Sequence, residues 1–262
     1  MLNGLCNVNI ELTSRCNKSC WCCGRRKIER DYPALVNWGD MEFKLIQKIA
    51  KQLPEGIVVQ FHNNGEPLLY PQLYGALRLF KNQVRTFNTN GLLLVEKAVE
   101  IIDNLDTLVI SVIENDPLAN EQYDIITTFL EMKGAHKPYI IFRLLGDVDS
   151  IKYERHGLIA SRVLHSPMGS YNYKKKVTIP EIGICLDMLH HLAIDRYGKV
   201  SICIRFDPNG LGVIGDLNKE SLNDIWNGEK RKKWLDLHLK GQRDKVPLCS
   251  TCDFWGVATG SK

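Results

Sequence analysis

Four cysteines fall within eight residues, at positions 16, 20, 22 and 23, and this group constrains the chain more than any other feature. Three of them, Cys16, Cys20 and Cys23, have the spacing C-x3-C-x2-C and follow an apolar run at residues 7–12. A short loop with this spacing can direct three thiolates to three corners of one [4Fe–4S] cluster. Four cysteines are the usual ligand set, so three leave one iron open to a small molecule. An open position is typical of a catalytic rather than a structural metal site.

Two other interpretations of the cysteines are weaker. A disulfide framework is disfavoured because the chain of 262 residues has 9 cysteines, an odd number. A zinc site with four thiolates could form from two C-x2-C pairs, one in this loop and one at positions 249 and 252. The pairs lie far apart in the sequence, and zinc would leave the cysteines at positions 16, 185 and 203 unexplained. We therefore favour iron–sulfur chemistry and keep zinc as the alternative.

The composition is ordinary for a globular protein, with 44% hydrophobic and 24% charged residues. A chain of this length can hold one large domain, or one domain and a small appendage. The formal net charge of +4 is too small to indicate nucleic-acid binding, and no apolar run is long enough to span a membrane. Unpaired thiols and an oxygen-sensitive cluster lead us to expect a cytoplasmic protein.

Short β-branched runs alternate with helical segments between residues 8 and 164. Strands are predicted over residues 8–12, 57–61, 84–87, 107–112, 139–145 and 158–164, and helices over residues 41–53, 71–81, 95–104 and 117–132. Asp40 is predicted to cap the first helix. This alternation predicts a parallel sheet. Six units are too few for a closed eight-stranded barrel, so the expected fold is α/β, an open and partial (βα)6 barrel. The reactive face of such folds lies at the carboxyl ends of the strands, where the cysteine loop would lie.

The pattern changes after about residue 183. Alternating runs at residues 191–195 and 199–204 predict a β-hairpin. Ser221 begins a sequence that resembles a capping box at a helix start, and a second helical stretch is predicted near residues 229–240. Four cysteines surround these elements, one before the hairpin, one on its second strand and two at the far end: Cys185, Cys203, Cys249 and Cys252.

In their order along the chain, these motifs resemble those of the radical S-adenosylmethionine (SAM) enzymes. The C-x3-C-x2-C loop follows the first strand, residues 64–69 (Asn-Gly-Glu-Pro-Leu-Leu) follow the second, and residues 88–91 (Asn-Thr-Asn-Gly) end the third. The resemblance implies that Cys16, Cys20 and Cys23 hold the cluster that binds SAM. It implies SAM contacts from residues of four successive strand ends: Gly65, Glu66, Pro67, Asn90, Ser111 and Arg143.

The C-terminal part is similar to the twitch form of the SPASM/twitch extension, in which four cysteines hold one auxiliary [4Fe–4S] cluster. The implied ligands are Cys185, Cys203, Cys249 and Cys252. The full SPASM type needs further cysteines for a second auxiliary cluster, but Cys6 and Cys22 lie at the other end of this chain. The resemblance thus divides the chain into residues 1–180, a partial barrel that binds [4Fe–4S] and SAM, and residues 181–262, a twitch-type domain of hairpin and helices.

The activity implied by the resemblance is that of a radical SAM oxidoreductase. Such enzymes take an electron from a reductant such as flavodoxin or ferredoxin, cleave SAM to methionine and a 5′-deoxyadenosyl radical, and abstract hydrogen from a substrate C–H bond. An auxiliary cluster with four cysteine ligands has no open iron for substrate, so it suits electron acceptance. This favours net two-electron oxidation of a small metabolite, a sugar- or cyclitol-type alcohol. A structural role for the second cluster is the alternative.

Two other functions remain open. One is a SPASM/twitch maturase that oxidises, epimerises or crosslinks a peptide or protein side chain. Because the first strand is predicted from residue 8, we expect such a peptide to be a separate chain. The other is a non-enzymatic zinc-ribbon binding module fused to a barrel. Iron and sulfide analysis would separate it from the first two.

The chain departs from the family pattern in two places. The residue before the third loop cysteine is usually aromatic and packs on the SAM adenine, but here it is Cys22, preceded by Trp21. Relatives that dehydrogenate alcohols can have an Arg-Gly sequence near the sixth strand, whereas residues 166–169 read Ser-Pro-Met-Gly. The substrate therefore stays open. So does the general base, for which the segment between the two parts offers several titratable residues: His165, His190, His191, Asp187, Tyr171 and Tyr173.

Overall fold

The computed structural model of the chain describes residues 1–162, 164, 185–204 and 207–252. All nine cysteines are within these ranges. The Ser-Pro-Met-Gly sequence and three of the candidate bases, His165, Tyr171 and Tyr173, lie outside the described residues. In the part of the chain that is described, no helix has both the length and the apolar composition needed to cross a bilayer.

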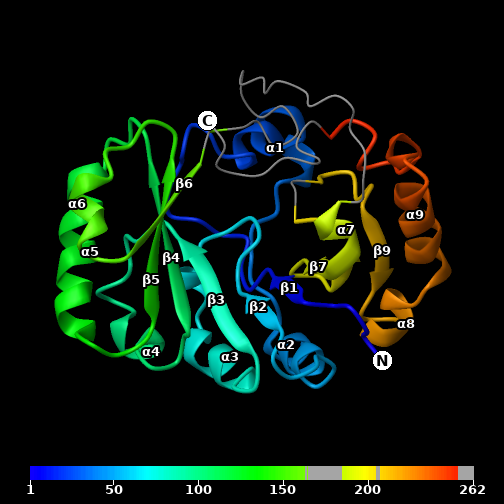
Figure 1. Ribbon diagram of the computed structural model, residues 1–262, viewed down its shortest axis with the longest axis horizontal. Coiled ribbons are helices and arrows are strands. Elements are labelled where there is room, and N and C mark those ends of the chain that lie inside the picture. Colours follow the sequence, from blue (N-terminus) through cyan, green and yellow to red (C-terminus); the bar gives the residue numbers. More distant parts are fainter. Residues whose placement is uncertain (163, 165–184, 205–206, 253–262) are drawn as a thin grey trace.

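The described strands form one sheet in the order β6-β5-β4-β3-β2-β1-β7-β8-β9 (Figure 1). Its first six strands pair in parallel, each with its neighbour in the sequence. They are β1 (Asn7–Ile10), β2 (Val58–Gln60), β3 (Val84–Thr89), β4 (Thr107–Ile113), β5 (Tyr139–Leu145) and β6 (Leu158–Arg162). Because these strands run in one direction, their carboxyl ends share one edge of the sheet. The α/β class and the parallel sheet predicted from the sequence are confirmed.

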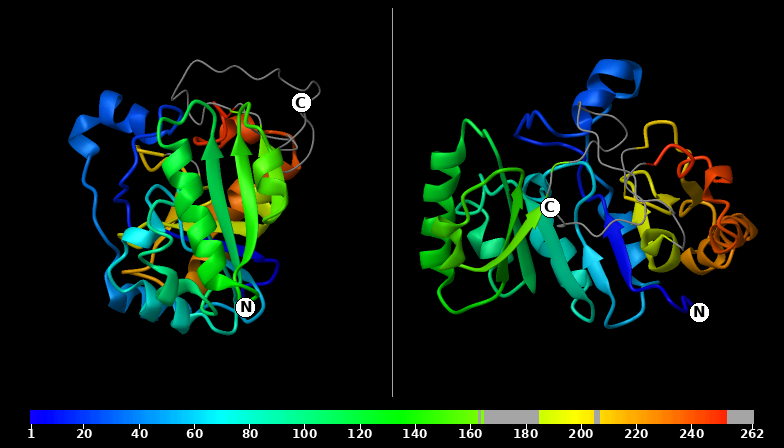
Figure 2. Two further views of the ribbon diagram at one scale, coloured as in Figure 1. Left: turned by 90° about the vertical axis from the view of Figure 1, so that its left-hand side faces the viewer. Right: turned by 45° about the horizontal axis from the view of Figure 1, so that its top comes forward.

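Helices connect the parallel strands and pack along the sheet (Figure 1). They are α2 (Phe43–Ala50), α3 (Leu73–Leu79), α4 (Ala98–Ile101), α5 (Ala119–Lys133) and α6 (Ile151–Glu154). Helix α1 (Arg25–Asp31) follows the cysteine loop instead. It lies at the end of the molecule toward which the arrowheads of β4 and β5 point (Figure 2). Short 3-10 turns cover Pro33–Leu35, Pro67–Leu69 and Arg243–Lys245.

The strands have one apolar face and one polar face. Leu108, Ile110 and Val112 of β4 alternate with intermediate residues and belong to the main hydrophobic core, as expected for side chains that point alternately to the two faces of a sheet. Residues on the other face include polar and charged side chains from five strands or strand ends: Asn9, His62, Asn88, Ser111 and Arg143. Burial of the apolar face against the helices holds the sheet together, and the polar face remains for chemistry.

The C-terminal part continues the same sheet. β7 (His191–Ile194) pairs with β1 in parallel over its full length, and β8 (Lys199–Ser201) and β9 (Val213–Asp216) add antiparallel strands. Helices α7 (Leu186–His190), α8 (Leu222–Trp226) and α9 (Glu229–Leu239) complete this part. The predicted hairpin is therefore confirmed. It joins the parallel strands at β1, so one sheet runs through both predicted parts of the chain.

Two capping predictions had opposite outcomes. Ser221 caps α8 as predicted, since its hydroxyl oxygen accepts a hydrogen bond from the Asp224 backbone N–H at 3.1 Å. Asp40 does not cap α2: the helix begins after Glu42, without a side-chain cap. The Asp40 carboxylate instead forms a two-pronged ion pair with Arg15, at 3.0 and 2.7 Å. A charged partner in the cysteine loop outcompetes the helix end.

Candidate functional site

The cysteine loop lies beyond the carboxyl end of β1, as predicted. Cys16, Cys20, Cys22 and Cys23 are all half-buried. Burial, with a smaller contribution from neighbouring loop thiols, raises the pKa of Cys20 to about 12 and that of Cys22 to about 11. Desolvated thiols this close to one another become thiolates only when a cation shares their charge. The donor set therefore fits a bound metal cluster.

Among the described residues, no three His, Cys, Asp or Glu side chains are grouped closely enough to hold one metal ion.

Buried cations fix the cysteine loop to its surroundings. Arg25 is 5% exposed; its Nη1 donates hydrogen bonds to the carbonyl oxygens of Ser14 and, at 3.1 Å, of Asn64. Its guanidinium stacks on Trp38, with Cζ 4.0 Å from the ring centroid. On the other side of the loop, Lys18 forms a buried ion pair with Asp116, which follows β4. These contacts join the loop to segments far away in the sequence and hold the thiols in place.

The second loop packs directly on the first at Gly65. A Cβ atom on Gly65 would lie 2.1 Å from the carbonyl oxygen of Thr13 and 2.7 Å from that of Arg15. The next residue, Glu66, donates its backbone N–H to the same Arg15 carbonyl at 2.8 Å. Only glycine allows this approach of two backbones. Gly65 is thus required for the contact between the two loops, whatever else it binds.

The Glu66 side chain points into the protein. Its carboxylate accepts hydrogen bonds from the Thr89 hydroxyl at 2.7 Å and from the backbone N–H groups of Asn90 and Leu68, at 2.8 and 3.1 Å. Burial raises the pKa of Glu66 to about 7, although these donors favour the charged form. Glu66 therefore joins the loop after β2 to the end of β3. Its assignment as a SAM contact remains a prediction, as does that of Pro67, which starts the following 3-10 turn.

Asn90 follows β3 and touches the cysteine loop. Its Nδ2 donates to Asn17 Oδ1 at 2.8 Å and lies 3.9 Å from Cys16 Sγ. The Asn-Thr-Asn-Gly motif thus lies against the cysteine loop, and its assignment as a SAM contact remains a prediction. Gly91 ends the motif with φ at +81°, a conformation that favours glycine.

Ser111 and Arg143 meet on the polar face of the sheet. They are register partners on β4 and β5, and Arg143 Nη2 donates to Ser111 Oγ at 3.0 Å. Arg143 Nε is buried and has no hydrogen-bond partner among the described residues. Burial lowers the pKa of Arg143 to about 10, with Arg162 adding to the effect. The group is still charged near neutral pH and suits an anionic ligand such as a carboxylate.

The C-terminal cysteines gather around one small apolar cluster. Cys185, Cys203 and Cys249 pack against the buried side chains of Met188, Ile202, Trp234, Val246 and Leu248. Cys252 is close enough to Cys185 to raise its pKa, although burial raises it more. Arg243 Nη1 donates to the carbonyl oxygens of Cys249 and Cys252, at 2.8 and 3.3 Å. The four cysteines predicted to form one site thus come from three segments to one place, and a cluster there fits the donor set.

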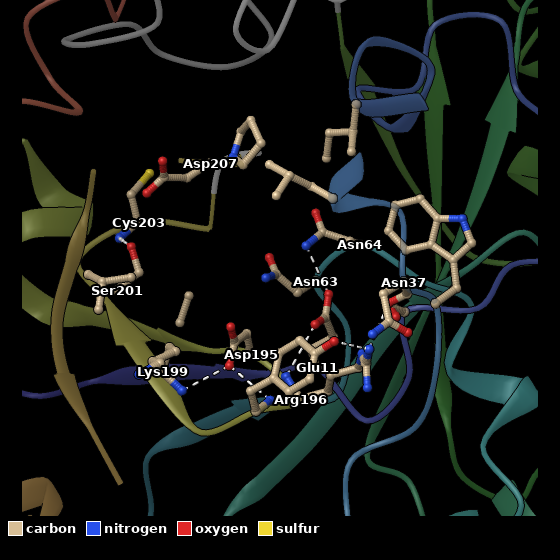
Figure 3. Close-up of a pocket in the computed structure, with 18 residues that line it drawn as sticks. Glu11, Asn37, Asn63, Asn64, Asp195, Arg196, Lys199, Ser201, Cys203 and Asp207 are labelled. Atoms are coloured by element: carbon tan, nitrogen blue, oxygen red, sulfur yellow. Dashed lines mark hydrogen bonds between the residues drawn. The ribbon is translucent and has the colours of Figure 1, made fainter. Parts of the chain in front are cut away.

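A cavity lined by both polar and apolar side chains lies between the loop after β2 and the hairpin of β7 and β8 (Figure 3). Ser14 lines it beside the cysteine loop, and Cys203 lines it on the hairpin side. Glu11 is 4% exposed and accepts hydrogen bonds from Asn64 Nδ2 at 2.8 Å and from the Arg196 backbone N–H at 3.2 Å. Burial raises the pKa of Glu11. A small polar molecule could lie here, within reach of both ends.

Several residues of the site were not identified from the sequence. Lys18 and Asp116 are 98 residues apart, and Glu11 and Arg196 are 185 apart, so no local pattern connects them. His62 and Asn9 lie in apolar-looking strand segments, where alternation alone marked their neighbours as core. A polar residue within such a run was the available signal, because buried polar groups need partners.

Comparison with known families matches residues 185–253 to the SPASM family, described as an iron–sulfur cluster-binding domain. The chain is 24% identical over 259 residues to the S-adenosyl-L-methionine-dependent 2-deoxy-scyllo-inosamine dehydrogenase of Niallia circulans, over 96% of this chain and 94% of the relative. A match of 31% identity over 101 residues covers 37% of this chain and 27% of a second relative. That protein is the tungsten-containing aldehyde ferredoxin oxidoreductase cofactor-modifying protein of Pyrococcus furiosus.

Solved structures share the fold. BtrN, crystallised with AdoMet and 2-DOIA, has a TM-score of 0.69 at 19% identity, over 98% of this chain and 96% of BtrN. SuiB of Streptococcus suis, bound to the precursor peptide SuiA, has a TM-score of 0.63 at 14% identity, over 96% of this chain and 72% of SuiB. At these identities the likeness concerns the fold alone. Residues 185–253 thus match an iron–sulfur cluster-binding SPASM domain, and along nearly its whole length the chain is similar to a SAM-dependent dehydrogenase and shares the fold of BtrN and SuiB.

Proposed function

We propose that the chain is a radical SAM oxidoreductase that oxidises an alcohol group of a small hydroxylated metabolite to a carbonyl. The observation that carries this proposal is a partly polar cavity that Cys203 borders on one side and Ser14, two residues before Cys16, borders on another. In this proposal Cys16, Cys20 and Cys23 hold the first [4Fe–4S] cluster. The auxiliary cluster is held by Cys185, Cys203, Cys249 and Cys252.

When bound, the first cluster and SAM supply one-electron reductive cleavage of SAM to methionine and a 5′-deoxyadenosyl radical. The substrate then loses a hydrogen atom from carbon to form 5′-deoxyadenosine, a proton from oxygen, and one electron to the auxiliary site. Atoms and electrons balance: one electron enters from an external reductant of the flavodoxin or ferredoxin class, and one leaves through the auxiliary site. The product is the carbonyl compound.

The chain's own residues position the reactants. Arg143 and Ser111 offer a cation and a hydroxyl for the SAM carboxylate. The backbone at residues 65–67 and the side chain of Asn90, which contact the cysteine loop, offer further SAM contacts. Asn63 and Asn64 present buried Oδ1 atoms that have no partner among the described residues, and both line the cavity. Unpaired buried polar atoms suit a hydroxylated ligand, because binding such a ligand satisfies them.

The finer architecture follows the same proposal. Residues 1–180 form the partial (βα)6 barrel, and residues 181–262 form the twitch-type domain with one auxiliary cluster, in a cytoplasmic enzyme. The dehydrogenase relative matches along nearly the whole chain, which favours a small-molecule alcohol. The fold likeness to SuiB supports the alternative, modification of a separate peptide. A cavity lined by Glu11 and Asp195 is better suited to a small polar ligand than to an apolar side chain.

Anaerobic purification and reconstitution tests the proposal. Two four-iron clusters give about eight iron and about eight sulfide per chain. With SAM and dithionite the protein should form 5′-deoxyadenosine, and 2-deoxy-scyllo-inosamine should increase that rate and yield a carbonyl product. Zinc without iron, or iron without 5′-deoxyadenosine, would contradict the proposed function. SAM cleavage stimulated by a peptide and not by cyclitols would favour the alternative.

A further inference from the structure

His62 lies on the polar face of the sheet, two residues after β2 ends. Its neighbour Phe61 is fully buried in the hydrophobic core, whereas His62 is partly accessible. Arg143 from β5 and His191 from β7 both act electrostatically on its ring. In the sheet order, β5 and β7 lie on opposite sides of β2. His62 therefore lies between these two side chains on the polar face of the sheet.

The hydrogen bonds of His62 fix its tautomer. The backbone N–H of Asn88 donates to Nδ1 at 3.2 Å. Since an N–H group can only donate, Nδ1 carries the lone pair, and a neutral ring then carries its proton on Nε2. No residue in the described part of the chain has a recorded hydrogen bond to Nε2. His62 thus presents an unused N–H donor on the polar face of the sheet.

A second set of contacts holds the His62 backbone in place. Asn9 Nδ2 donates to the His62 carbonyl at 2.8 Å. This orients the Asn9 amide, so that Oδ1 accepts a hydrogen bond from His191 Nε2 at 2.6 Å. His191 is held in turn by Asp187, whose Oδ1 lies 3.3 Å from Nδ1. The donor is therefore positioned by a chain of buried polar contacts from β1 and β7, which is the arrangement expected for a preorganised binding group.

The electrostatic surroundings keep His62 neutral. Burial, with a smaller electrostatic effect from Arg143 and His191, lowers the pKa of His62 to about 3. A ring that accepts a hydrogen bond at Nδ1 and resists protonation is unsuited to remove a proton from substrate. It can donate from Nε2 throughout the range in which enzymes work.

We propose that His62 is a substrate-binding donor whose Nε2–H binds the hydroxyl oxygen that becomes the carbonyl, and that it is not the general base. This inference rests on the proposed function and adds the chemical class recognised at this position: an uncharged oxygen acceptor. A neutral donor binds the alcohol and the carbonyl alike and strengthens as charge develops on oxygen during oxidation. It also selects against a substrate with an ammonium group at that position.

The tautomer can be tested without substrate. In 15N-histidine-labelled, oxidised and anaerobic holoenzyme, the His62 resonances are assigned as those lost in His62→Gln. We expect a proton on Nε2 and no titration between pH 5 and 8. A proton on Nδ1, or a midpoint near the ordinary histidine value of about 6.5, would overturn the inference.

Substrate binding tests the contact itself, with 2-deoxy-scyllo-inosamine as the probe and SAM present. His62→Phe should weaken binding about tenfold, as expected when a polar contact is lost in a buried site, and His62→Gln, which retains a donor, should recover most of it. Equal affinity for wild type and His62→Phe would overturn the contact. In that case 5′-deoxyadenosine formation by the same samples shows that the proposed function still stands. Wild-type protein that binds no cyclitol would overturn the contact together with the proposed substrate class.

Discussion

Arg143 on β5 and Ser111 on β4 are register partners, and Arg143 Nη2 donates a hydrogen bond to Ser111 Oγ at 3.0 Å. Arg143 Nε is buried and has no hydrogen-bond partner among the described residues. A buried cation with an unused donor destabilises a protein unless a ligand completes its surroundings. The pair therefore indicates an anion site on the polar face. The SAM carboxylate is the anion that the family resemblance places there.

Replacing Arg143 should weaken SAM binding more than it affects folding. We expect Arg143→Gln to raise the dissociation constant of SAM by about tenfold or more, since hydrogen bonds to charged groups contribute about 1.5 to 3 kcal/mol. Arg143→Lys should recover only part, because an ammonium lacks the planar fork. Isothermal titration of anaerobic protein measures this, with the exposed Arg78→Gln on α3 as the matched control. An unchanged affinity in Arg143→Gln would remove Arg143 from the SAM site.

The cysteine loop gives a second prediction, because it contains one more thiol than the proposed ligand set. Cys16→Ala should abolish 5′-deoxyadenosine formation and reduce the iron content from about eight to about four per chain. Cys22→Ala should retain the iron, since Cys22 is not a proposed ligand, although burial raises its pKa as it does for its neighbours. Iron analysis and the product assay on both variants decide the matter. If iron were instead lost in Cys22→Ala and retained in Cys16→Ala, Cys22 would replace Cys16 in the proposed ligand set.

The auxiliary cysteines should be separable from SAM cleavage. We expect Cys249→Ala to retain 5′-deoxyadenosine formation but to lose oxidised product, because the electron from the substrate then has no acceptor. The comparison is the ratio of product to 5′-deoxyadenosine in single-turnover reactions, with Cys6→Ala, an exposed cysteine near the start of the chain, as the control. Normal turnover by a Cys249→Ala protein that lacks the auxiliary iron would leave that cluster a structural role only.

The parallel sheet and both cysteine groups could be predicted because their signals are local. Six short apolar runs separated by helical periodicity require a parallel sheet, and thiol spacing is read directly from the chain. α1, α7 and β9 were missed because seven, five and four residues carry little periodicity. Asp40 was assigned to a helix cap although Arg15, 25 residues away, binds it. Such competition between a local and a distant partner cannot be judged before the fold brings them together.

The packing of Gly65 on the cysteine loop predicts a severe effect for a very small change. Gly65→Ala places a methyl group 2.1 Å from the Thr13 carbonyl oxygen, so the backbone leading to Cys16 must move, at a cost of about 1 to 3 kcal/mol. We expect SAM cleavage to be lost and the iron content to fall by about four, with the auxiliary iron retained. Gly75→Ala is the control, since its nearest neighbour is the Phe43 ring at 3.3 Å, which can shift. Gly65→Ala protein with full iron and activity would show that the loops need no such contact.

The ion pairs of Asp106 predict how stability depends on pH. Partial burial would raise the pKa of Asp106, but hydrogen bonds from Arg85 and Lys137 outweigh it and lower the pKa to about 2, from 3.8. Because the folded-state pKa is the lower one, the stabilisation is complete above pH 3.8 and is lost as the pH falls from 3.8 toward 2.

Asp106→Asn should therefore lower the free energy of unfolding by about 1 to 2 kcal/mol and the midpoint of thermal unfolding by about 2 to 8 °C, by the same amount at every pH from 5 to 8. Anaerobic thermal unfolding of both proteins over that range measures it. Lys137→Gln should cost less, because Lys137 is 48% exposed in its ion pair whereas Arg85 is 12% exposed. A difference between wild type and Asp106→Asn that changes between pH 5 and 8 would mean that another titrating group, and not Asp106, sets this part of the stability.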